Sequence, residues 1–230
     1  MKLYRRGFLA KGTAIFSGTF YNGPKAFSNP KIRKTMSRPL IISTWPFGEV
    51  ANKKAMEIIE SGGSSIDAVE KGINVTENDK ENTSVGIGGL PNSEGIVQLD
   101  ACIMHGPGHK AGSVMGIEKI RNPISVARKV MEHTPHVQLV GKGAQEFAIS
   151  QGFKEEDLLT EKSKLKWLEW KKNNQKKKPE GTIDNHDTIA LLILDENGNL
   201  TGGCSTSGLA FKLPGRVGDS PIIGGGLYVD

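Results

Sequence analysis

The sequence has few cysteines, no long apolar run and no internal repeat. Its two cysteines, Cys102 and Cys204, are too few for a disulfide framework, and buried thiols are favoured over a single bridge. No stretch reaches the roughly 18 apolar residues that indicate a membrane span. The 230 residues, with 37% hydrophobic and 24% charged side chains, instead suit one globular domain with a sizeable core.

Acidic residues are absent from residues 1–38, which hold nine Lys and Arg. The whole chain has a net charge of +5, but residues 39–230 keep only 21 of the 30 basic groups against all 25 acidic ones, a net of −4. If the basic leader ends after Ser28 instead, the remainder is neutral. Nucleic-acid binding needs basic charge on the folded body, whereas much of the basic charge of this chain lies in the leader. The positive net charge is therefore weak evidence for such a partner, and we expect no nucleic-acid partner.

The N-terminus carries Tyr4-Arg-Arg-Gly-Phe-Leu9, followed by a modestly apolar run over residues 13–21. This pattern resembles a twin-arginine export signal, with cleavage near Ala26-Phe-Ser28. A basic N-terminus without a signal is the alternative. We expect a leader over residues 1–38 and a periplasmic or secreted protein, with no membrane association beyond export. Folding in the cytosol before export fits the low cysteine count.

Apolar spacing predicts helices, strands and one hairpin along the rest of the chain. Residues with β propensity form candidate strands, and apolar residues at helical spacing form candidate helices, one of them capped by Ser64 or Ser65. Asp195-Glu-Asn-Gly-Asn199 is a hairpin turn signal between two strands. Without a regular βαβ rhythm, the order favours an antiparallel sheet with helices around it. The expected strands are 40–45, 95–104, 188–194 and 200–205, and the expected helices are 49–60, 66–74, 123–133 and 143–151.

Residues 154–186 differ in composition from the rest, with a lysine tract over residues 171–178. We interpret this segment as a mobile linker between a first part of the domain, 39–187, and a second part that starts at 188. Within this linker, residues 164–170 can form a short helical turn. Lysines beside tryptophans can also bind nucleic acid, and this is the less favoured interpretation.

Three motifs then carry a family resemblance: His186-Asp-Thr-Ile189, Cys204-Ser-Thr-Ser-Gly208 and Gly215-Arg-Val-Gly-Asp-Ser-Pro221. Together they resemble the glycosylasparaginases (aspartylglucosaminidases), which are N-terminal-nucleophile hydrolases, and the resemblance spans roughly residues 40–230. It implies an α+β fold, a four-layer αββα sandwich, incomplete here at the C-terminus. The family continues beyond the end of this chain with a Thr-Gly pair that forms the oxyanion hole. We therefore expect these 230 residues alone to be inactive and poorly stable.

Thr188 is the predicted nucleophile. A threonine hydroxyl needs a nearby base at neutral pH, and an N-terminal threonine supplies one through its own α-amine, whose pKa is about 7.7–8. This requires a cut between Asp187 and Thr188, for which we predict an N→O acyl shift. The resemblance assigns the promotion of this step to Asp187, with His186 beside it.

The resemblance also assigns roles to residues around the nucleophile. Thr206 is expected to orient it, and Arg216 and Asp219 to bind the α-carboxylate and α-ammonium of the substrate. A surface ion pair between Arg216 and Asp219 is the alternative. Trp45 and Phe47 match residues of the family's substrate cleft, although core aromatics at a strand end are the simpler explanation of these two alone.

The implied reaction is hydrolysis of the amide bond between N-acetylglucosamine and an asparagine side chain, without a metal or an organic cofactor. The expected partner is a small glycosylated asparagine, and the expected assembly is a homodimer of α/β heterodimers. His105 and His109 are predicted to be solvated loop residues rather than metal ligands. The alternatives are an isoaspartyl peptidase or L-asparaginase, which usually has Gly before the threonine, and an inactive exported binding protein.

Overall fold

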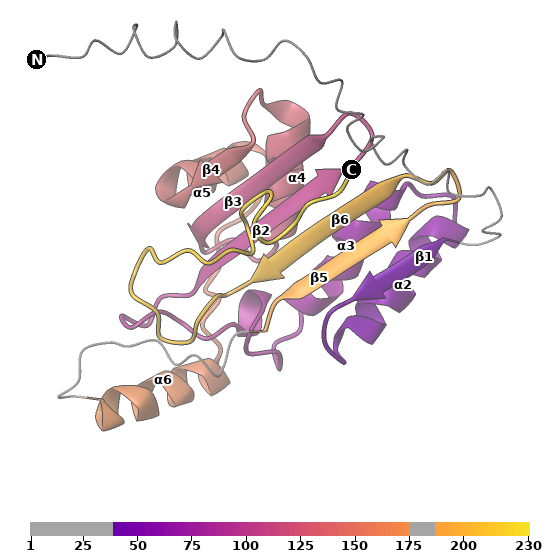
Figure 1. Ribbon diagram of the computed structural model, residues 1–230. Helices are drawn as coiled ribbons and strands as arrows, with labels where there is room; N and C mark the ends of the chain where they lie inside the picture. Colours follow the sequence, from indigo (N-terminus) through magenta and orange to yellow (C-terminus); the bar gives the residue numbers. More distant parts are fainter. Residues whose placement is uncertain (1–38, 175–186) are drawn as a thin grey trace, which may run out of the picture. The chain divides into compact units, whose positions relative to one another are not determined.

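A six-stranded sheet in the order β1-β5-β6-β2-β3-β4 forms the centre of the structure (Figure 1). Neighbouring strands are antiparallel except for the parallel pair β3–β4. The hairpin of β5 and β6 lies between β1 and the hairpin of β2 and β3, so β5 is an interior strand with a neighbour on each side. The strands are β1 (Leu40–Ser43), β2 (Gln98–His105), β3 (Lys110–Glu118), β4 (Gln138–Val140), β5 (Ile189–Leu194) and β6 (Leu200–Thr206).

The computed structural model describes residues 39–174 and 187–230, and all of them belong to one compact unit. The expected leader, His186 and part of the expected linker lie outside the described residues. Within the described part, the fold is a mixed α/β arrangement built on one largely antiparallel sheet, as the sequence predicted.

The helices begin and end close to their predicted positions. Helix α3 starts at a capping box, in which the Ser64 hydroxyl accepts from the Asp67 amide at 3.2 Å and the Asp67 carboxylate accepts from the Ser64 amide at 3.1 Å. Helix α4 begins at Pro123, which has no amide hydrogen to leave unpaired in the first turn. These local signals explain why the sequence predicted both helices. The helices are α2 (Gly48–Glu60), α3 (Ser65–Glu77), α4 (Pro123–His133) and α5 (Gly141–Ser150), with a 3₁₀ turn η1 (Gly86–Gly88).

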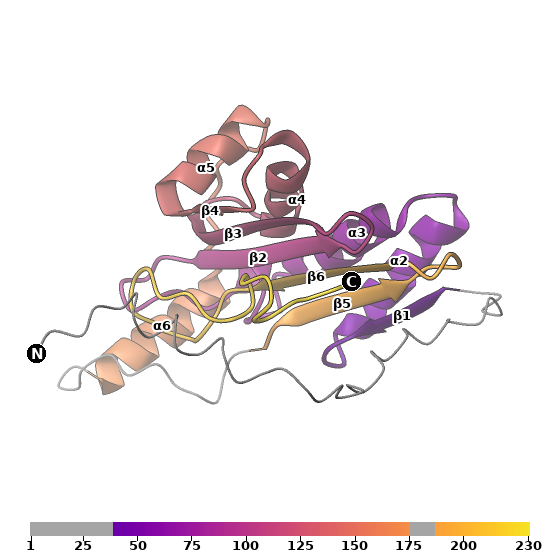
Figure 2. The ribbon, with the colours of Figure 1, turned by 45° about the horizontal axis from the view of Figure 1, so that its top comes forward.

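The two faces of the sheet are covered differently (Figures 1 and 2). Helices α2, α3 and α4 cover one face, where Ile189, Leu191 and Ile193 of β5 are fully buried in the main core. Residues 207–230 cross the other face and cover a smaller cluster with Leu227 and Val229. On that second face the β1 side chains Leu40 and Ile42 are 51% and 52% exposed. The core therefore lies on the helix side of the sheet.

Cys102 and Cys204 face each other across the β2–β6 pair on the second face. Both are buried and free, which confirms the prediction of buried thiols over a disulfide bridge. The Cys102 thiol donates to the carbonyl oxygen of Ser220 at 3.1 Å, so the segment after β6 is tied to the middle of the sheet.

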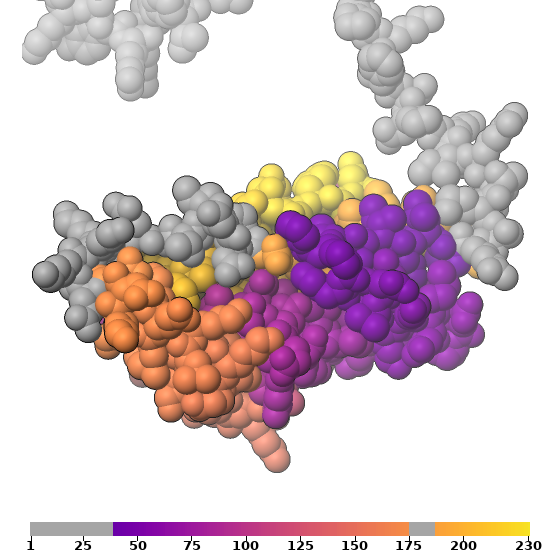
Figure 3. Space-filling model, turned by 90° about the horizontal axis from the view of Figure 1, so that it is seen from below, coloured from indigo at the N-terminus to yellow at the C-terminus, as the bar shows by residue number. Residues whose placement is uncertain are grey.

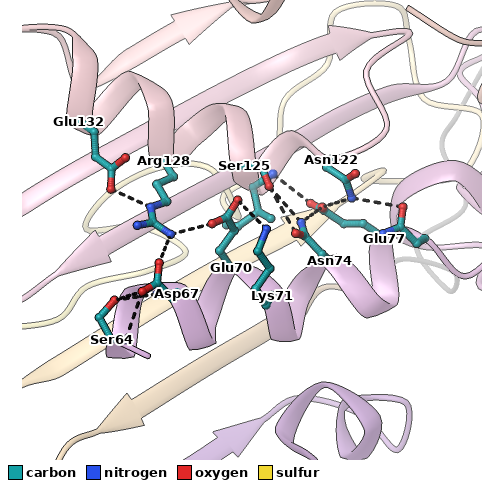
Figure 4. A network of polar contacts seen from close by, with 12 residues as sticks. Ser64, Asp67, Glu70, Lys71, Asn74, Glu77, Asn122, Ser125, Arg128 and Glu132 are labelled. Atoms are coloured by element: carbon teal, nitrogen blue, oxygen red, sulfur yellow. Dashed lines mark hydrogen bonds and ion pairs between the residues drawn. The ribbon is translucent and has the colours of Figure 1, made fainter. Parts of the chain in front are cut away.

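A polar network joins helix α3 to helix α4 (Figure 4). Arg128 on α4 binds three carboxylates: Asp67 at 2.6 Å, Glu70 at 2.7 Å and Glu132 at 2.7 Å. Further along the same pair of helices, the buried carboxylate of Glu77 accepts four hydrogen bonds from uncharged donors. The donors are Ser205 Oγ at 2.7 Å, Ile124 N at 3.0 Å, Asn74 Nδ2 at 3.0 Å and Asn122 Nδ2 at 3.0 Å.

Part of the expected linker is a helix, because residues 161–173 form α6 (Glu161–Asn173). The Thr160 hydroxyl caps its first turn by accepting from the Ser163 amide at 3.3 Å. On the packed side, the ring of Trp170 stacks on that of Phe211 with a centroid distance of 4.8 Å. The contact with Phe211 joins residues that are distant in the sequence, so composition could not reveal it. Composition therefore predicted a linker where the chain forms a packed helix.

Candidate active site

Thr188 lies directly before β5, at the end of the sheet where β1 and β6 finish. Its carbonyl oxygen accepts a hydrogen bond from the Thr44 hydroxyl, and that hydroxyl accepts from the Ala190 amide at 2.9 Å. The Thr188 backbone is thus held by Thr44, the residue that follows β1. Thr188 itself is half-buried. Figure 3 views the molecule from below, the side on which β5 begins, with α6 in orange and α2 in indigo on either side of gold atoms from the C-terminal part.

The Thr188 hydroxyl has a partner that the sequence did not predict. Its oxygen lies 3.0 Å from the hydroxyl oxygen of Ser220, which is buried. Ser220 belongs to the same Gly215–Pro221 motif as Arg216 and Asp219, so the motif itself was the available signal. This contact joins the predicted nucleophile to the predicted substrate-binding loop.

Thr206 lies on the other side of the predicted cleavage point. Its hydroxyl donates toward the carbonyl oxygen of Asp187 at 3.4 Å, with the Ser84 carbonyl as a second acceptor at 3.5 Å. The same hydroxyl oxygen accepts from the Gly208 amide at 2.9 Å, which fixes its position. Thr206 therefore contacts the carbonyl that the Thr188 hydroxyl would attack.

Arg216 lies on the loop that follows β6, and its guanidinium lies against glycine backbone. An ideal Cβ on Gly218 would lie 3.0 Å from Arg216 Nη1, and one on Gly208 would lie 3.4 Å from the same atom. The loop turns at Gly215, whose φ is +80° and whose amide donates to the side-chain oxygen of Gln98 at 3.0 Å. Both glycines next to the guanidinium leave space that larger side chains would fill.

Asp219 is exposed, and none of the ion pairs between described residues joins it to Arg216. The alternative of a surface pair between these two side chains thus has no support in the described structure. Arg216 is half-buried and Asp219 is exposed, on the loop whose Ser220 contacts Thr188, so a ligand can reach both charged groups.

Trp45 and Phe47 have different surroundings. Trp45 is 53% exposed and has a φ of +63°, an unusual conformation for a bulky residue that occurs often at functional sites. It directly follows Thr44, the residue that binds the Thr188 carbonyl. Phe47 instead packs partly buried against the helix-side core. For Phe47 the structure agrees better with the simpler explanation, a core aromatic at the end of the strand.

Comparisons with known proteins place the chain in a family. A family model described as Asparaginase matches residues 31–230. The chain belongs to this asparaginase family. It is 56% identical over 197 residues to the N(4)-(Beta-N-acetylglucosaminyl)-L-asparaginase of Elizabethkingia miricola, an alignment that covers 86% of this chain and 57% of the relative. The chain therefore spans little more than half the length of that relative.

Two proteins of Rattus norvegicus are also similar to this asparaginase-family chain. The rat N(4)-(Beta-N-acetylglucosaminyl)-L-asparaginase is 40% identical over 237 residues, covering 90% of this chain and 68% of the relative. The rat isoaspartyl peptidase/L-asparaginase is 41% identical over 183 residues, covering 78% and 54%. Identity does not separate the two named activities between the rat proteins, but the 56% identity to the Elizabethkingia protein is well above both.

The asparaginase-family chain also buries a charged pair near the candidate site. Lys212 and Asp100 lie 3.5 Å apart between Nζ and Oδ2, with side chains 1% and 0% exposed. Burial raises the pKa of Asp100 and lowers the pKa of Lys212, while the charge of each partner opposes the effect of burial. No local sequence pattern indicates this pair, because its members are 112 residues apart in the chain.

Among residues 39–174 and 187–230, no group of three or more His, Cys, Asp or Glu side chains is arranged to hold a metal ion. The same residues contain no helix that is long and apolar enough to cross a membrane. His105 does not lie in a loop as predicted. It ends β2, and its ring Nδ1 lies 2.9 Å from the Thr201 hydroxyl.

Proposed function

We propose that this protein is a self-cleaving amidohydrolase that hydrolyses the bond between N-acetylglucosamine and the side chain of asparagine. The observation that carries the proposal is the position of the Thr206 hydroxyl, which donates toward the Asp187 carbonyl oxygen at 3.4 Å, directly before Thr188. Membership of the asparaginase family and the names of the relatives from Elizabethkingia and rat support the choice of substrate.

In the proposed self-cleavage, the Thr188 hydroxyl oxygen attacks the carbonyl carbon of Asp187. The Asp187–Thr188 peptide bond breaks as an ester forms, and the nitrogen takes up the hydroxyl proton. Water then hydrolyses the ester and leaves Thr188 with a free α-amine. The Thr206 hydroxyl would stabilise the negative charge that develops on the Asp187 carbonyl oxygen. Asp187 and His186 are the proposed promoters of the attack.

In the proposed hydrolysis, the freed α-amine of Thr188 accepts the proton of its own hydroxyl. The hydroxyl oxygen attacks the side-chain amide of the substrate, the glycosylamine leaves, and a β-aspartyl ester remains on Thr188. Water releases aspartate and restores the enzyme. Ser220 lies 3.0 Å from the attacking oxygen and would orient it through a hydrogen bond.

The proposed substrate is held by its free amino-acid end. The half-buried guanidinium of Arg216 offers parallel N–H donors to the α-carboxylate. The exposed carboxylate of Asp219 would accept from the α-ammonium. Trp45 would form an exposed wall beside the nucleophile, and we propose no substrate contact for Phe47.

The test is a denaturing gel of the purified full-length gene product, with sequencing of the new N-terminus. We expect two pieces, the smaller starting Thr-Ile-Ala-Leu, and turnover of a glycosylated asparagine. Thr188→Ala should give one uncut band without turnover, and Thr188→Ser should still be cut. An uncut wild-type band that is unchanged by Thr188→Ala would contradict the proposal and favour an inactive binding protein.

A second activity, that of an isoaspartyl peptidase or L-asparaginase, is favoured by the 41% identity to the rat protein of that name. Asp187 before the threonine argues for the glycosylated substrate. Steady-state kinetics on glycosylated asparagine, free asparagine and a β-aspartyl dipeptide separate the two. The proposal requires the highest kcat/KM on the glycosylated substrate.

We also propose that the sheet is one half of a four-layer αββα sandwich. The exposed apolar side chains of Leu40 and Ile42, on the face away from the helices, would pack against a second sheet. A homodimer of α/β heterodimers and twin-arginine export to the periplasm belong to the same proposal. Light scattering on the cleaved protein and fractionation of the source cells test these two points.

A further inference from the structure

The ion pair of Lys212 and Asp100 lies at the same end of the sheet as Thr188. Lys212 Nζ also donates to the carbonyl oxygen of Gln98 at 3.2 Å, and Asp100 Oδ1 accepts from the Gly116 amide at 2.7 Å. Burying two charges costs free energy that their mutual attraction often fails to offset, so stability alone is a weak reason for this pair. Its position suggests a role at the candidate site.

Asp100 is held rigidly beside the proposed catalytic residues. It is the register partner of Thr206 in the β2–β6 pair. On its other side, the β2–β3 register shifts between Leu99 and Ala101, and Gly116 at this irregularity has a φ of +58°. The Asp100 carboxylate binds the amide that this β-bulge exposes, so the acid has a fixed place next to the site.

Two cationic groups act on this one acid: Lys212 pairs with it directly, and the positive charge of Arg216 also opposes the rise in the Asp100 pKa that burial causes. An ideal Cβ on Gly208 would lie 3.0 Å from Lys212 Nζ and 3.4 Å from Arg216 Nη1, so both groups lie against the same glycine. Lys212 is fully buried, whereas Arg216 is half-buried and in reach of a ligand. If Lys212 did not neutralise Asp100, the nearby guanidinium would be the available counterion for a buried carboxylate.

We infer that Lys212 is a positioning residue that neutralises Asp100 and thereby leaves Arg216 free to bind the α-carboxylate of the substrate. The inference rests on the proposed function. A buried carboxylate without its partner is strongly destabilising, so removal of the ammonium should draw Arg216 toward Asp100. The guanidinium would then be occupied when the substrate arrives.

The experiment compares Lys212→Met, Asp100→Asn and the double variant in the self-cleaved, full-length protein. Lys212→Met should raise KM for glycosylated asparagine, and Kd for the product L-aspartate, by about 10- to 100-fold. We expect kcat to change less, because the α-carboxylate is bound equally in the ground state and the transition state. The double variant should return both constants close to those of Asp100→Asn, because no buried acid then competes for Arg216.

Lys110→Met, which removes an exposed lysine from β3, is the matched control and should leave both constants unchanged. A double variant as impaired as Lys212→Met, or an unchanged KM in Lys212→Met, would overturn the inference. If Lys212→Met alone does not fold, the double variant is compared with Asp100→Asn: equal KM values support the inference, and a much higher KM in the double variant overturns it. A wild-type protein that neither hydrolyses the substrate nor binds L-aspartate would instead overturn the proposed function itself.

Discussion

Arg128 and Arg216 have the same side chain in opposite surroundings. Arg128 lies between helices α3 and α4, where three carboxylates bind it at 2.6–2.7 Å and its side chain is 18% exposed. Arg216 lies on the loop after β6, against the backbone of Gly208 and Gly218. Of the ion pairs that join described residues, none includes Arg216.

The difference indicates what each arginine does. A guanidinium has five N–H donors, and those of Arg128 are largely used inside the protein, so this residue joins two helices. The guanidinium of Arg216 is half-buried against Gly208 and Gly218, and no carboxylate of a described residue pairs with it, so its donors can bind a ligand carboxylate. Arginine is thus scaffold in one place and a candidate binding residue in the other, and substitutions should separate these roles.

Replacement of Arg216 by Gln should have the largest effect. Loss of a charge-assisted pair with the substrate is expected to lower kcat/KM on glycosylated asparagine by about 10²–10³-fold, mainly through KM. The melting temperature should change little, because no described carboxylate forms an ion pair with this guanidinium and Asp100 keeps Lys212 as its direct partner. Enzyme kinetics and thermal unfolding of the same preparation measure both quantities.

Arg216→Lys is the matched variant for this prediction. It keeps the charge but loses the planar pair of donors, so it should fall between the wild type and Arg216→Gln. Equal activity of all three proteins would mean that Arg216 does not bind the substrate.

Glu77 extends the comparison to an acid without a charged partner. The carboxylates around Arg128 are paired with a guanidinium, whereas the fully buried Glu77 is bound only by uncharged donors. Burial raises its pKa from 4.5 to about 7, against the effect of hydrogen bonds from Ser205, Asn122, Ile124 and Asn74. Between these two pH values the folded state keeps a proton that the unfolded chain has released. The contribution of Glu77 to stability is therefore full below pH 4.5 and is lost as pH rises toward 7, by about 3 kcal/mol at ~1.4 kcal/mol per pKa unit.

Urea unfolding of wild type and Glu77→Gln across this pH range tests the prediction. The glutamine does not titrate, so the difference in unfolding free energy between the two proteins should shift in favour of the variant as pH rises. A difference that stays constant from pH 4.5 to 7 would show that the Glu77 pKa is not raised.

Replacement of Arg128 by Met should reduce stability and leave the site intact. Three carboxylates, among them the nearly buried Glu70, would lose their common partner, and we expect a loss of about 2 kcal/mol because part of the network is solvent-screened. The KM of the folded protein should equal that of the wild type. A raised KM at unchanged stability would reverse the roles assigned to the two arginines.

Local sequence signals predicted much of the helix and hairpin structure. The alternation of buried residues in β5 and the Asp195–Asn199 turn act within a few residues, as does Pro123 at the start of α4. Strand β3 was not predicted. Helix α4 packs so closely on this strand that position 112 has room only for glycine. A Cβ on Gly112 would lie 2.0 Å from the carbonyl oxygen of Ala127. Such close approaches arise only in the folded protein.

The site divides in the same way. Thr188, Thr206, Arg216 and Asp219 stand in short motifs, so the family resemblance pointed to them. The pairing of Lys212 with Asp100 joins positions 112 residues apart, and no local pattern indicates it. Only a short turn of helix α6 was predicted, for the same reason: the ring that receives Trp170 belongs to a loop after β6.

The exposed pair of Lys142 and Glu146 on α5 should show the smallest effect. Its charged atoms lie 3.4 Å apart, but the side chains are 88% and 65% exposed, so water and salt screen the attraction. A double-mutant cycle with alanine should give a coupling energy near zero, and each variant should melt within about 1 °C of the wild type. The same cycle on Arg128 and Glu70 should give a clear coupling. Equal coupling in the two cycles would mean that burial does not distinguish the Arg128 network from an ordinary surface pair.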